Sequence, residues 1–338
     1  MNNTFWQKRF RWNVLSAELT TGYTLLLPVP GDLPVFLKIA LDVCSRQASD
    51  HLVETLVVPD HLTPGFEQLI AVLGKNYSIS PLRLVKFPPE DQLLVERLNP
   101  HLNYWLQLIR GGMAARASHA VLHDADLFIT DPQFLKNHYE TCRERELACL
   151  GVSPVWDTWF KKQGISHVVA TWEMIFELTW LRSFEPWQHM GHEDTLDGKE
   201  HEFDITLWPQ CKTSPRRIGI HPQETGFVHF NYVICTYRWF QRSQTSYEDE
   251  HFRLLLIRLL IDAYDHSSGW PYELPSLAEM MKGLTDSSNP VTYLAESTRR
   301  NYPAFRLKLH DVIKSGLVGD ERAAILKKGI AAFDKALR

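Results

Sequence analysis

Two aspartates, Asp124 and Asp126, follow an apolar run in the segment 119-HAVLHDADLFITDP-132. Carboxylates separated by one residue at the end of a strand can both reach one cation, directly or through water. Mg²⁺ and Mn²⁺ prefer such oxygen ligands and keep open positions for phosphate oxygens. A cation held there would offset the charge that grows on a departing diphosphate. The pair therefore predicts a divalent-metal site; the alternative is that Asp124 caps a turn and Asp126 is merely exposed.

Alternating strands and helices are expected to position this pair. Apolar runs bounded by Pro, Gly and Asp predict buried strands, and apolar residues at helical spacing predict the helices between them. The β-α-β-α-β order is typical of a parallel sheet with right-handed crossovers. The predicted strands cover 23–30, 53–60, 82–89 and 120–128, and the predicted helices cover 33–47, 64–76 and most of 99–120.

The ends of these strands carry the other candidate residues. Pro28, Asp60 and the Asp124/Asp126 pair each lie at the carboxyl end of a predicted strand. In open parallel sheets, ligands bind beyond the carboxyl ends of the strands. We therefore expect all of these side chains to face one rim of the sheet.

Composition excludes several classes of protein. The 338 residues are 44% hydrophobic and 22% charged, which is ordinary for a globular protein. A net charge of −4 argues against electrostatic capture of nucleic acid. No uncharged run is long enough to cross a bilayer, and the N-terminal residues lack the pattern of a signal peptide. Five cysteines without CxxC spacing are typical of a reduced protein, so we expect a cytoplasmic location.

Three stretches appear in an order that resembles the nucleotide-sugar glycosyltransferases of the GT-A fold, especially the family-2-like group. They are 25-LLLPVPGDLPVFLKIALDVCSRQ-47, 56-LVVPD-60 and 110-RGGMAARASHAVLHDADLF-128. The resemblance lies in their order and spacing. It implies a Rossmann-like, mostly parallel α/β sheet flanked by helices. The implied domains are a GT-A domain over 1–247, with a nucleotide-binding half over about 20–135 and an acceptor half over about 136–247, and a helical C-terminal extension over 248–338.

The resemblance also implies roles for residues of the nucleotide-binding half. Pro28 would line the base pocket, and Asp60 would hydrogen-bond the base or ribose. Arg110 and Arg116 would approach the base or the diphosphate; the alternative is that they are exposed helix charges. Asp124 would contact the ribose or the donor sugar as well as the metal.

A third metal ligand is implied by 226-GFVHFNYV-233, the start of a predicted strand over 226–237. Several GT-A enzymes use a histidine in the C-terminal part as a further ligand, and His229 resembles it. With Asp124 and Asp126 it would hold Mn²⁺ or Mg²⁺, and Mn²⁺ accepts one imidazole more readily. Asn231 would contact the donor. The alternative for His229 is a hydrogen-bonded core residue.

The segment 191-GHEDTLDGKEHEFDITLW-208 supplies candidates for the catalytic base. Inverting sugar transfer needs a carboxylate that takes the proton of the acceptor hydroxyl. The family often carries an acidic pair at the start of a helix, and Glu193 and Asp194 resemble it; a helix N-terminus would keep them ionised. Asp204 is a competing candidate, and a solvated acidic loop is the alternative for all three.

Histidine and tryptophan residues near this segment admit further interpretations. A zinc site is disfavoured because Cys partners and an HExxH pattern are lacking. The tryptophans could stack on an acceptor sugar or pack the two halves together. The histidines are His189, His192 and His201, and the tryptophans are Trp156, Trp159 and Trp172.

The helical C-terminal extension has two interpretations. It could cap the first domain or form a homodimer, or its basic residues could touch the inner face of a membrane. We favour the cap because the basic charge is modest. The residues that the membrane interpretation invokes are Lys327, Lys328, Lys335 and Arg338, beside Ile325, Leu326 and Phe333.

Together these features predict a metal-dependent glycosyltransferase that moves a sugar, most simply a hexose, from a UDP- or GDP-sugar to a hydroxyl group. The acceptor would be a glycan, a lipid-linked molecule or a small molecule. One alternative is a sugar nucleotidyltransferase, although 28-PVPGDLP-34 lacks the basic, glycine-rich loop of that class. The other is a catalytically silent carbohydrate-binding protein on the same fold.

Overall fold

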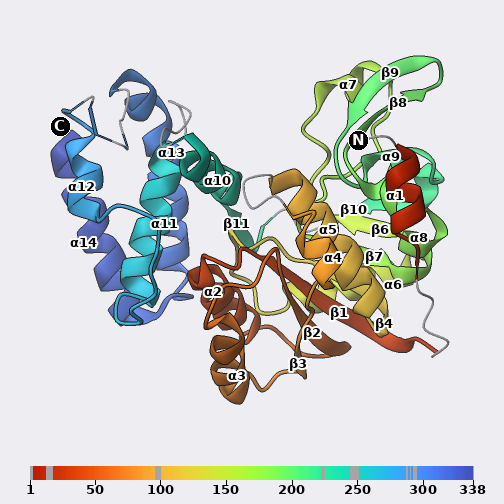
Figure 1. Ribbon diagram of the computed structural model, residues 1–338, viewed down its shortest axis with the longest axis horizontal. Coiled ribbons are helices and arrows are strands. Elements are labelled where there is room, and N and C mark those ends of the chain that lie inside the picture. Colours follow the sequence, from red (N-terminus) through yellow and green to blue (C-terminus); the bar gives the residue numbers. More distant parts are fainter. Residues whose placement is uncertain are drawn as a thin grey trace.

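The computed structural model describes residues 3–12, 18–95, 100–221, 225–243, 251–286, 288–289, 291 and 295–337. Figure 1 shows a central sheet with helices packed around it and a group of C-terminal helices, drawn in blue, at one side. The fold class that the resemblance implied is confirmed: a mostly parallel α/β sheet flanked by helices is followed by a helical C-terminal part.

The central sheet has seven strands in the order β10-β6-β7-β4-β1-β2-β3. The run β4-β1-β2-β3 is parallel, β10 and β6 are parallel to each other, and β7 runs antiparallel between β4 and β6. The strands are β1 (Thr20–Val29), β2 (Leu52–Pro59), β3 (Leu82–Leu84), β4 (Ala117–Leu122), β6 (Cys149–Gly151), β7 (Met174–Glu177) and β10 (Ile218–Ile220).

Helices cover both faces of this sheet because successive strand residues point to opposite sides. In β1, Leu25 and Leu27 belong to one buried cluster, whereas Leu26 belongs to another. The first cluster includes side chains of α2 (Pro34–Cys44) and α6 (Phe134–Glu144). The second includes side chains of α5 (Pro100–Ala114) and α8 (Leu178–Ser183). The other helices described before residue 212 are α1 (Asn3–Arg9), α3 (Phe66–Asn76), α4 (Pro89–Gln92), α7 (Thr158–Lys162), α9 (Leu207–Cys211) and the 3-10 helix η1 (Pro186–His189).

Two predicted strands differ from the structure. The third strand stops at Leu84 rather than continuing to 89. The fourth lies at Ala117–Leu122, so the aspartate pair sits in the turn after it and not on the strand. The next strand, β5 (Leu127–Ile129), leaves the main sheet and pairs antiparallel with β11 (Phe227–His229).

Two further predictions about secondary structure were wrong. Glu193 and Asp194 lie on a strand, β8 (His192–Leu196), and not at the start of a helix. A tight turn joins β8 to β9 (Lys199–Phe203), and the hairpin stands away from the main sheet (Figure 1). The strand predicted over 226–237 ends at His229, and the chain continues as helix α10 (Val233–Ser243).

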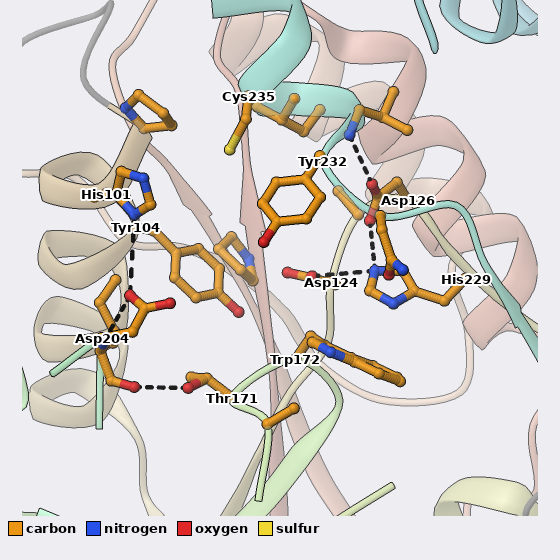
Figure 2. A pocket seen from close by; sticks show the side chains of 18 of the residues that line it. His101, Tyr104, Asp124, Asp126, Thr171, Trp172, Asp204, His229, Tyr232 and Cys235 are labelled. Atoms are coloured by element: carbon orange, nitrogen blue, oxygen red, sulfur yellow. Dashed lines mark hydrogen bonds and ion pairs between the residues drawn. The ribbon is translucent and has the colours of Figure 1, made fainter. Parts of the chain in front are cut away.

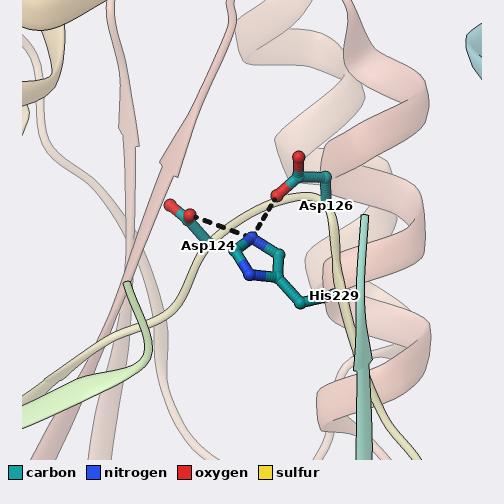
Figure 3. A group of neighbouring side chains, drawn as sticks. All are labelled: Asp124, Asp126 and His229. Atoms are coloured by element: carbon teal, nitrogen blue, oxygen red, sulfur yellow. Dashed lines mark hydrogen bonds and ion pairs between the residues drawn. The ribbon is translucent and has the colours of Figure 1, made fainter. Parts of the chain in front are cut away.

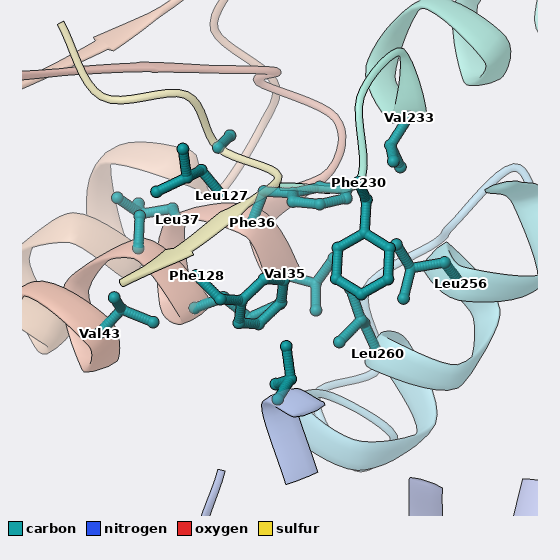
Figure 4. Packing of buried hydrophobic residues seen from close by; sticks show 14 of the residues in the cluster. Val35, Phe36, Leu37, Val43, Leu127, Phe128, Phe230, Val233, Leu256 and Leu260 are labelled. Carbon is teal, nitrogen blue, oxygen red and sulfur yellow. The ribbon is translucent and has the colours of Figure 1, made fainter. Parts of the chain in front are cut away.

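The C-terminal helices pack on the sheet domain. They are α11 (His251–Tyr264), α12 (Leu277–Lys282), α13 (Ala295–Lys314) and α14 (Gly319–Leu337). Figure 4 shows Phe230 between side chains of the sheet domain, among them Phe36, and Leu256 and Leu260 of α11. This continuous core supports the cap interpretation. The predicted domain boundary near 247 falls in 244–250, outside the described residues.

The apolar residues that the membrane interpretation needed are occupied in this core. Leu326 and Phe333 are buried, and Ile325 packs against the same cluster. Lys327, Lys328 and Lys335 are exposed, but the apolar side chains beside them face inward. Arg338 lies outside the described residues. Within the described part of the chain, no helix has the length and apolar character needed to span a membrane.

Candidate active site

The candidate site lies where the order of the parallel strands reverses. The chain passes from β1 to β2 and β3 on one side, and then returns to place β4 on the other side of β1. At such a switch point the crossovers diverge and leave a crevice beyond the strand ends. A cavity of about 460 Å³ occupies this position and is lined by residues at the ends of β1, β2 and β4. Its volume is in the range of sites that hold small ligands and cofactors.

An aspartate–aspartate–histidine cluster lies at one end of this cavity (Figure 3). His229 Nε2 is 3.1 Å from Asp126 Oδ1 and 3.5 Å from Asp124 Oδ2. The register of β11 against β5 produces this geometry, because His229 pairs with Leu127, the residue after Asp126. The amide of Val233, at the start of α10, donates to the second oxygen of Asp126 at 3.2 Å. The three side chains predicted as metal ligands are thus brought together.

The cluster is electrostatically coupled. Burial alone would lower the pKa of His229, but the Asp126 carboxylate and the hydrogen bonds to both aspartates outweigh it and raise the pKa to about 9. Burial would raise the pKa of Asp126, but the His229 charge and hydrogen bonds lower it. A proton on His229 would balance the charge of the Asp126 carboxylate, 3.1 Å away.

These residues fit a divalent cation. Their candidate ligand atoms all lie within 4.8 Å of one another, and together they offer carboxylate oxygens and one imidazole nitrogen. Mn²⁺ accepts this donor set, and Mg²⁺ accepts its oxygens. The Asp124 side chain keeps 25% of its surface exposed toward the cavity, so coordination positions on that side would stay open to a ligand. Among the described residues, this is the one group of three or more potential ligands.

The opposite end of the rim carries Asp60, which is engaged by several donors. Arg238 Nη2 lies 2.7 Å from Asp60 Oδ2, and its Nη1 lies 2.7 Å from Asp32 Oδ2. Burial would raise the pKa of Asp60, but Arg238 and a hydrogen bond from His61 hold the pKa at about 2. The amide of Gly31 donates to Asp60 Oδ1 at 2.8 Å. The direct contact of Asp60 with a base or ribose stays a prediction, since these donors already occupy the carboxylate.

A third part of the cavity wall is formed by Thr171, Trp172 and Asp204 (Figure 2). Trp172 lies against His229, with ring centroids 4.2 Å apart, and its side chain lines the cavity. Burial and the nearby Asp124 raise the pKa of Tyr104 well above its usual range, so its hydroxyl keeps its proton. Asp204 lies on the opposite wall, 3.9 Å from His101 Nδ1, with 43% of its side chain exposed. Trp156 is 67% exposed at the rim.

Some predicted site residues lie in the cavity wall and others do not. Pro28, Asp60, Asp124, Asp126, His229 and Asn231 line it. The following predicted residues lie outside the set that lines it: Arg110, Arg116, Glu193, Asp194 and Trp159.

The positions outside the wall have local explanations. Arg110 is paired with the buried Asp91. Arg116 is exposed, and its amide donates to Glu54. Trp159 stacks on His201 of the hairpin, with ring centroids 4.0 Å apart. Neither arginine is the exposed helix charge of the alternative interpretation, because Arg110 is largely buried and Arg116 lies beyond the end of α5; their proposed roles stay predictions.

Sequence analysis missed Arg238, the buried cation at the Asp60 end. The prediction of a strand over 226–237 hid it, because it left the residue just past a strand end. The segment 233-VICTYRWFQRS-243 is amphipathic at helical spacing, which predicts a helix there, but the burial of Arg238 comes from its ion pairs with Asp32 and Asp60. The sequence also carries a signal for the hairpin, because 192-HEDTLDGKEHEF-203 has Asp-Gly at its centre, a strong predictor of a hairpin turn.

Comparisons with known proteins give matches to solved structures alone. No protein-family model matches the chain, and no curated protein matches it. The mannosyltransferase PcManGT from Pyrobaculum calidifontis, in complex with GDP-Man and Mn²⁺, is 14% identical with a TM-score of 0.42, over 96% of this chain and 90% of that one. Residues 1–349 of S. aureus TarS, in complex with UDP-GlcNAc, are 13% identical with a TM-score of 0.37, over 94% and 89%. Similarity at this level carries no argument by itself, so the function is argued from the geometry.

Proposed function

We propose that this protein is a metal-dependent glycosyltransferase of GT-A type. It would move a hexosyl group from a UDP- or GDP-sugar to a hydroxyl of a glycan, lipid-linked or small-molecule acceptor. The observation that carries the proposal is the Asp124–Asp126–His229 cluster in a cavity at the switch point of a parallel sheet. A divalent cation with open positions suits a diphosphate, and the remaining cavity has room for a nucleoside and a sugar.

The residues of the cavity divide the work by position. Asp124, Asp126 and His229 would hold Mn²⁺ or Mg²⁺, which when bound offsets negative charge on a leaving diphosphate. Pro28 and Val29 supply an apolar wall at the end of β1 where a base would lie. The protonated hydroxyl of Tyr104 can donate to an oxygen of the donor. The bound cation, the apolar wall and the Tyr104 hydroxyl would together orient the sugar nucleotide before transfer.

Asp204 is the carboxylate best placed to act as base if transfer inverts the anomeric centre. It lines the cavity on the wall opposite the cluster (Figure 2), whereas Glu193 and Asp194 lie on β8, outside the residues that line the cavity. Replacing Asp204 with Asn should slow transfer by about 10²-fold or more while leaving donor affinity unchanged. The same change at Asp194 is the matched control and should have little effect. The reverse result would restore the acidic pair as the base.

The products distinguish this function from its rivals. A glycosyltransferase releases a nucleoside diphosphate, a sugar nucleotidyltransferase releases or consumes pyrophosphate, and a silent binding protein releases neither. A thermal-shift panel of UDP-, GDP-, CMP- and dTDP-sugars with and without Mn²⁺ identifies the donor, because a bound ligand stabilises the folded chain. The chosen donor is then incubated with candidate acceptors, and both products are quantified. Loss of the sugar nucleotide that requires added pyrophosphate and yields a nucleoside triphosphate, in place of nucleoside diphosphate, would contradict the proposal.

Several parts of the proposal stand on the sequence. These are the division into 1–247 and 248–338, the cytoplasmic location, a homodimer and the acceptor class. The packing of the C-terminal helices on the sheet domain supports the cap interpretation over contact with a membrane. Sedimentation of the purified chain with and without anionic vesicles measures both its oligomeric state and its membrane contact.

A further inference from the structure

The end of β11 and the short segment that joins it to α10 carry three residues of the cavity wall, His229, Asn231 and Tyr232. Two cations of the C-terminal helices bind its backbone. Lys308 Nζ, from α13, donates to the carbonyl oxygen of His229 at 2.8 Å. Arg253 Nε, from α11, donates to the carbonyl oxygen of Asn231 at 2.7 Å. The C-terminal helices thus bind directly to the residues that form the metal end of the cavity.

The conformation of this segment explains why such bonds matter. Asn231 and Tyr232 both have left-handed backbone angles, with φ of 60° and 59°. For residues other than glycine this conformation is unfavourable, although Asn tolerates it better than Tyr. Such conformations persist only where the surrounding structure holds them. The Arg253 guanidinium also lies over the Tyr232 ring, 5.7 Å from its centroid.

On the sheet side, the described bonds to the backbone of this segment come from β5 and Asp126. The pairing of β11 with β5 covers three residues and ends at His229. Beyond it, the amides of Phe230 and Val233 bind the main-chain and side-chain oxygens of Asp126. The backbone of the His229 segment is therefore held between Asp126 on one side and Lys308 and Arg253 on the other.

We propose that Lys308 and Arg253 are positioning residues of the metal site, and that the C-terminal helices complete this site by holding the backbone that presents His229. The inference rests on the proposed function, because it assumes that the cluster binds a cation. Neither side chain lines the cavity wall, so neither is a catalytic residue. Each acts through the backbone. Lys308 holds the carbonyl of His229, and Arg253 holds the left-handed pair Asn231 and Tyr232.

The test measures the affinity of the full chain for Mn²⁺ alone, from the EPR signal of unbound Mn²⁺. Lys308→Met should weaken Mn²⁺ binding by about tenfold, as is typical when a group that orients a metal ligand is removed. Lys308→Arg should restore affinity, since a guanidinium can also donate to the His229 carbonyl. Lys314→Met, at an exposed position of the same helix, is the control and should bind Mn²⁺ as the original chain does.

Arg253→Met provides an independent second variant. It should also weaken Mn²⁺ binding, while Arg258→Met, which breaks an ion pair with Asp262 within the same helix, should not. Melting temperatures are recorded for all variants, and affinities are compared well below them. Unchanged Mn²⁺ affinity in Lys308→Met and Arg253→Met would overturn the inference. If the original chain itself fails to bind Mn²⁺, the metal dependence of the proposed function fails instead.

Discussion

The aspartates at the two ends of the sheet's rim differ in what balances their charge. At one end, Asp60 is paired with Arg238, a permanent cation that is itself 1% exposed. At the metal end, Asp124 and Asp126 face His229, whose positive charge depends on a proton that it can lose. A guanidinium cannot be displaced without unfolding part of the chain, whereas a proton exchanges readily for a metal ion. On the proposed function, aspartates serve stability at one end of the rim and bind a ligand at the other.

The largest expected effect is on the stability of the folded chain, through the Asp60–Arg238 pair. Replacing Arg238 with Met leaves Asp32 and Asp60 buried without their cation, which should lower the free energy of unfolding by about 3–5 kcal/mol. Urea unfolding at neutral pH measures it. Adding Asp60→Asn to this variant should recover part of the loss, because one of the uncompensated charges is then removed. A loss below about 1 kcal/mol would show that the two ends do not differ as described.

The second effect concerns activity at the metal end. Asp126→Asn should lower the rate of transfer by about 10²–10³-fold, since the cation would lose a ligand. Its effect on the free energy of unfolding should be smaller than that of Arg238→Met. Asp320→Asn, at an exposed position in the first turn of α14, is the control. Steady-state rates with saturating donor and Mn²⁺ give the comparison, and a variant that keeps full activity would argue against the metal site.

A smaller effect is expected on the free energy of unfolding when the pH is lowered. The pairing with Arg238 holds the pKa of Asp60 at about 2 in the folded chain, below its ordinary value of 3.8. The stability that it contributes is therefore fully present above pH 4 and is lost as the pH falls toward 2, amounting to roughly 2 kcal/mol. Urea unfolding between pH 5 and pH 2 should show this loss in the original chain. The corresponding part of the slope should be missing in Asp60→Asn; equal slopes would assign the loss to other carboxylates.

The smallest effect is expected at the outer rim. Trp156 is exposed at the edge of the cavity, where its indole face is available to an acceptor sugar. Trp156→Ala should raise KM for the acceptor about three- to tenfold and leave KM for the donor unchanged. Trp159→Ala, in the hairpin cluster outside the wall, should change neither. A rise in KM for the donor alone would show that Trp156 contacts the donor and not the acceptor.

The sequence predicts the parts of this molecule that depend on continuous apolar runs. The strands ending at Val29 and Pro59, and helices α2 and α3, follow from runs bounded by proline, glycine and aspartate. The rim position of Asp60 and of the aspartate pair follows from the parallel order. His229 was found through the resemblance, since no local pattern in 226-GFVHFNYV-233 indicates a ligand.

The remaining features depend on contacts between distant segments. The antiparallel strand β7 lies between β4 and β6 through pairings that the short run 174–177 does not specify. The cation that neutralises Asp60 comes from Arg238, 178 residues further along the chain. The role of Lys308 depends on packing of α13 against β11, which the amphipathic pattern of a helix does not disclose. Each is a tertiary choice among partners that local sequence leaves open.

The most direct test of the central claim is a crystal of the full chain soaked with MnCl₂ and UDP or GDP, measured at the manganese absorption edge. We expect an anomalous peak among Asp124, Asp126 and His229, with the diphosphate beside it and the base toward Pro28. A nucleotide bound in the cavity without such a peak, or a manganese ion held by other residues, would contradict the claim.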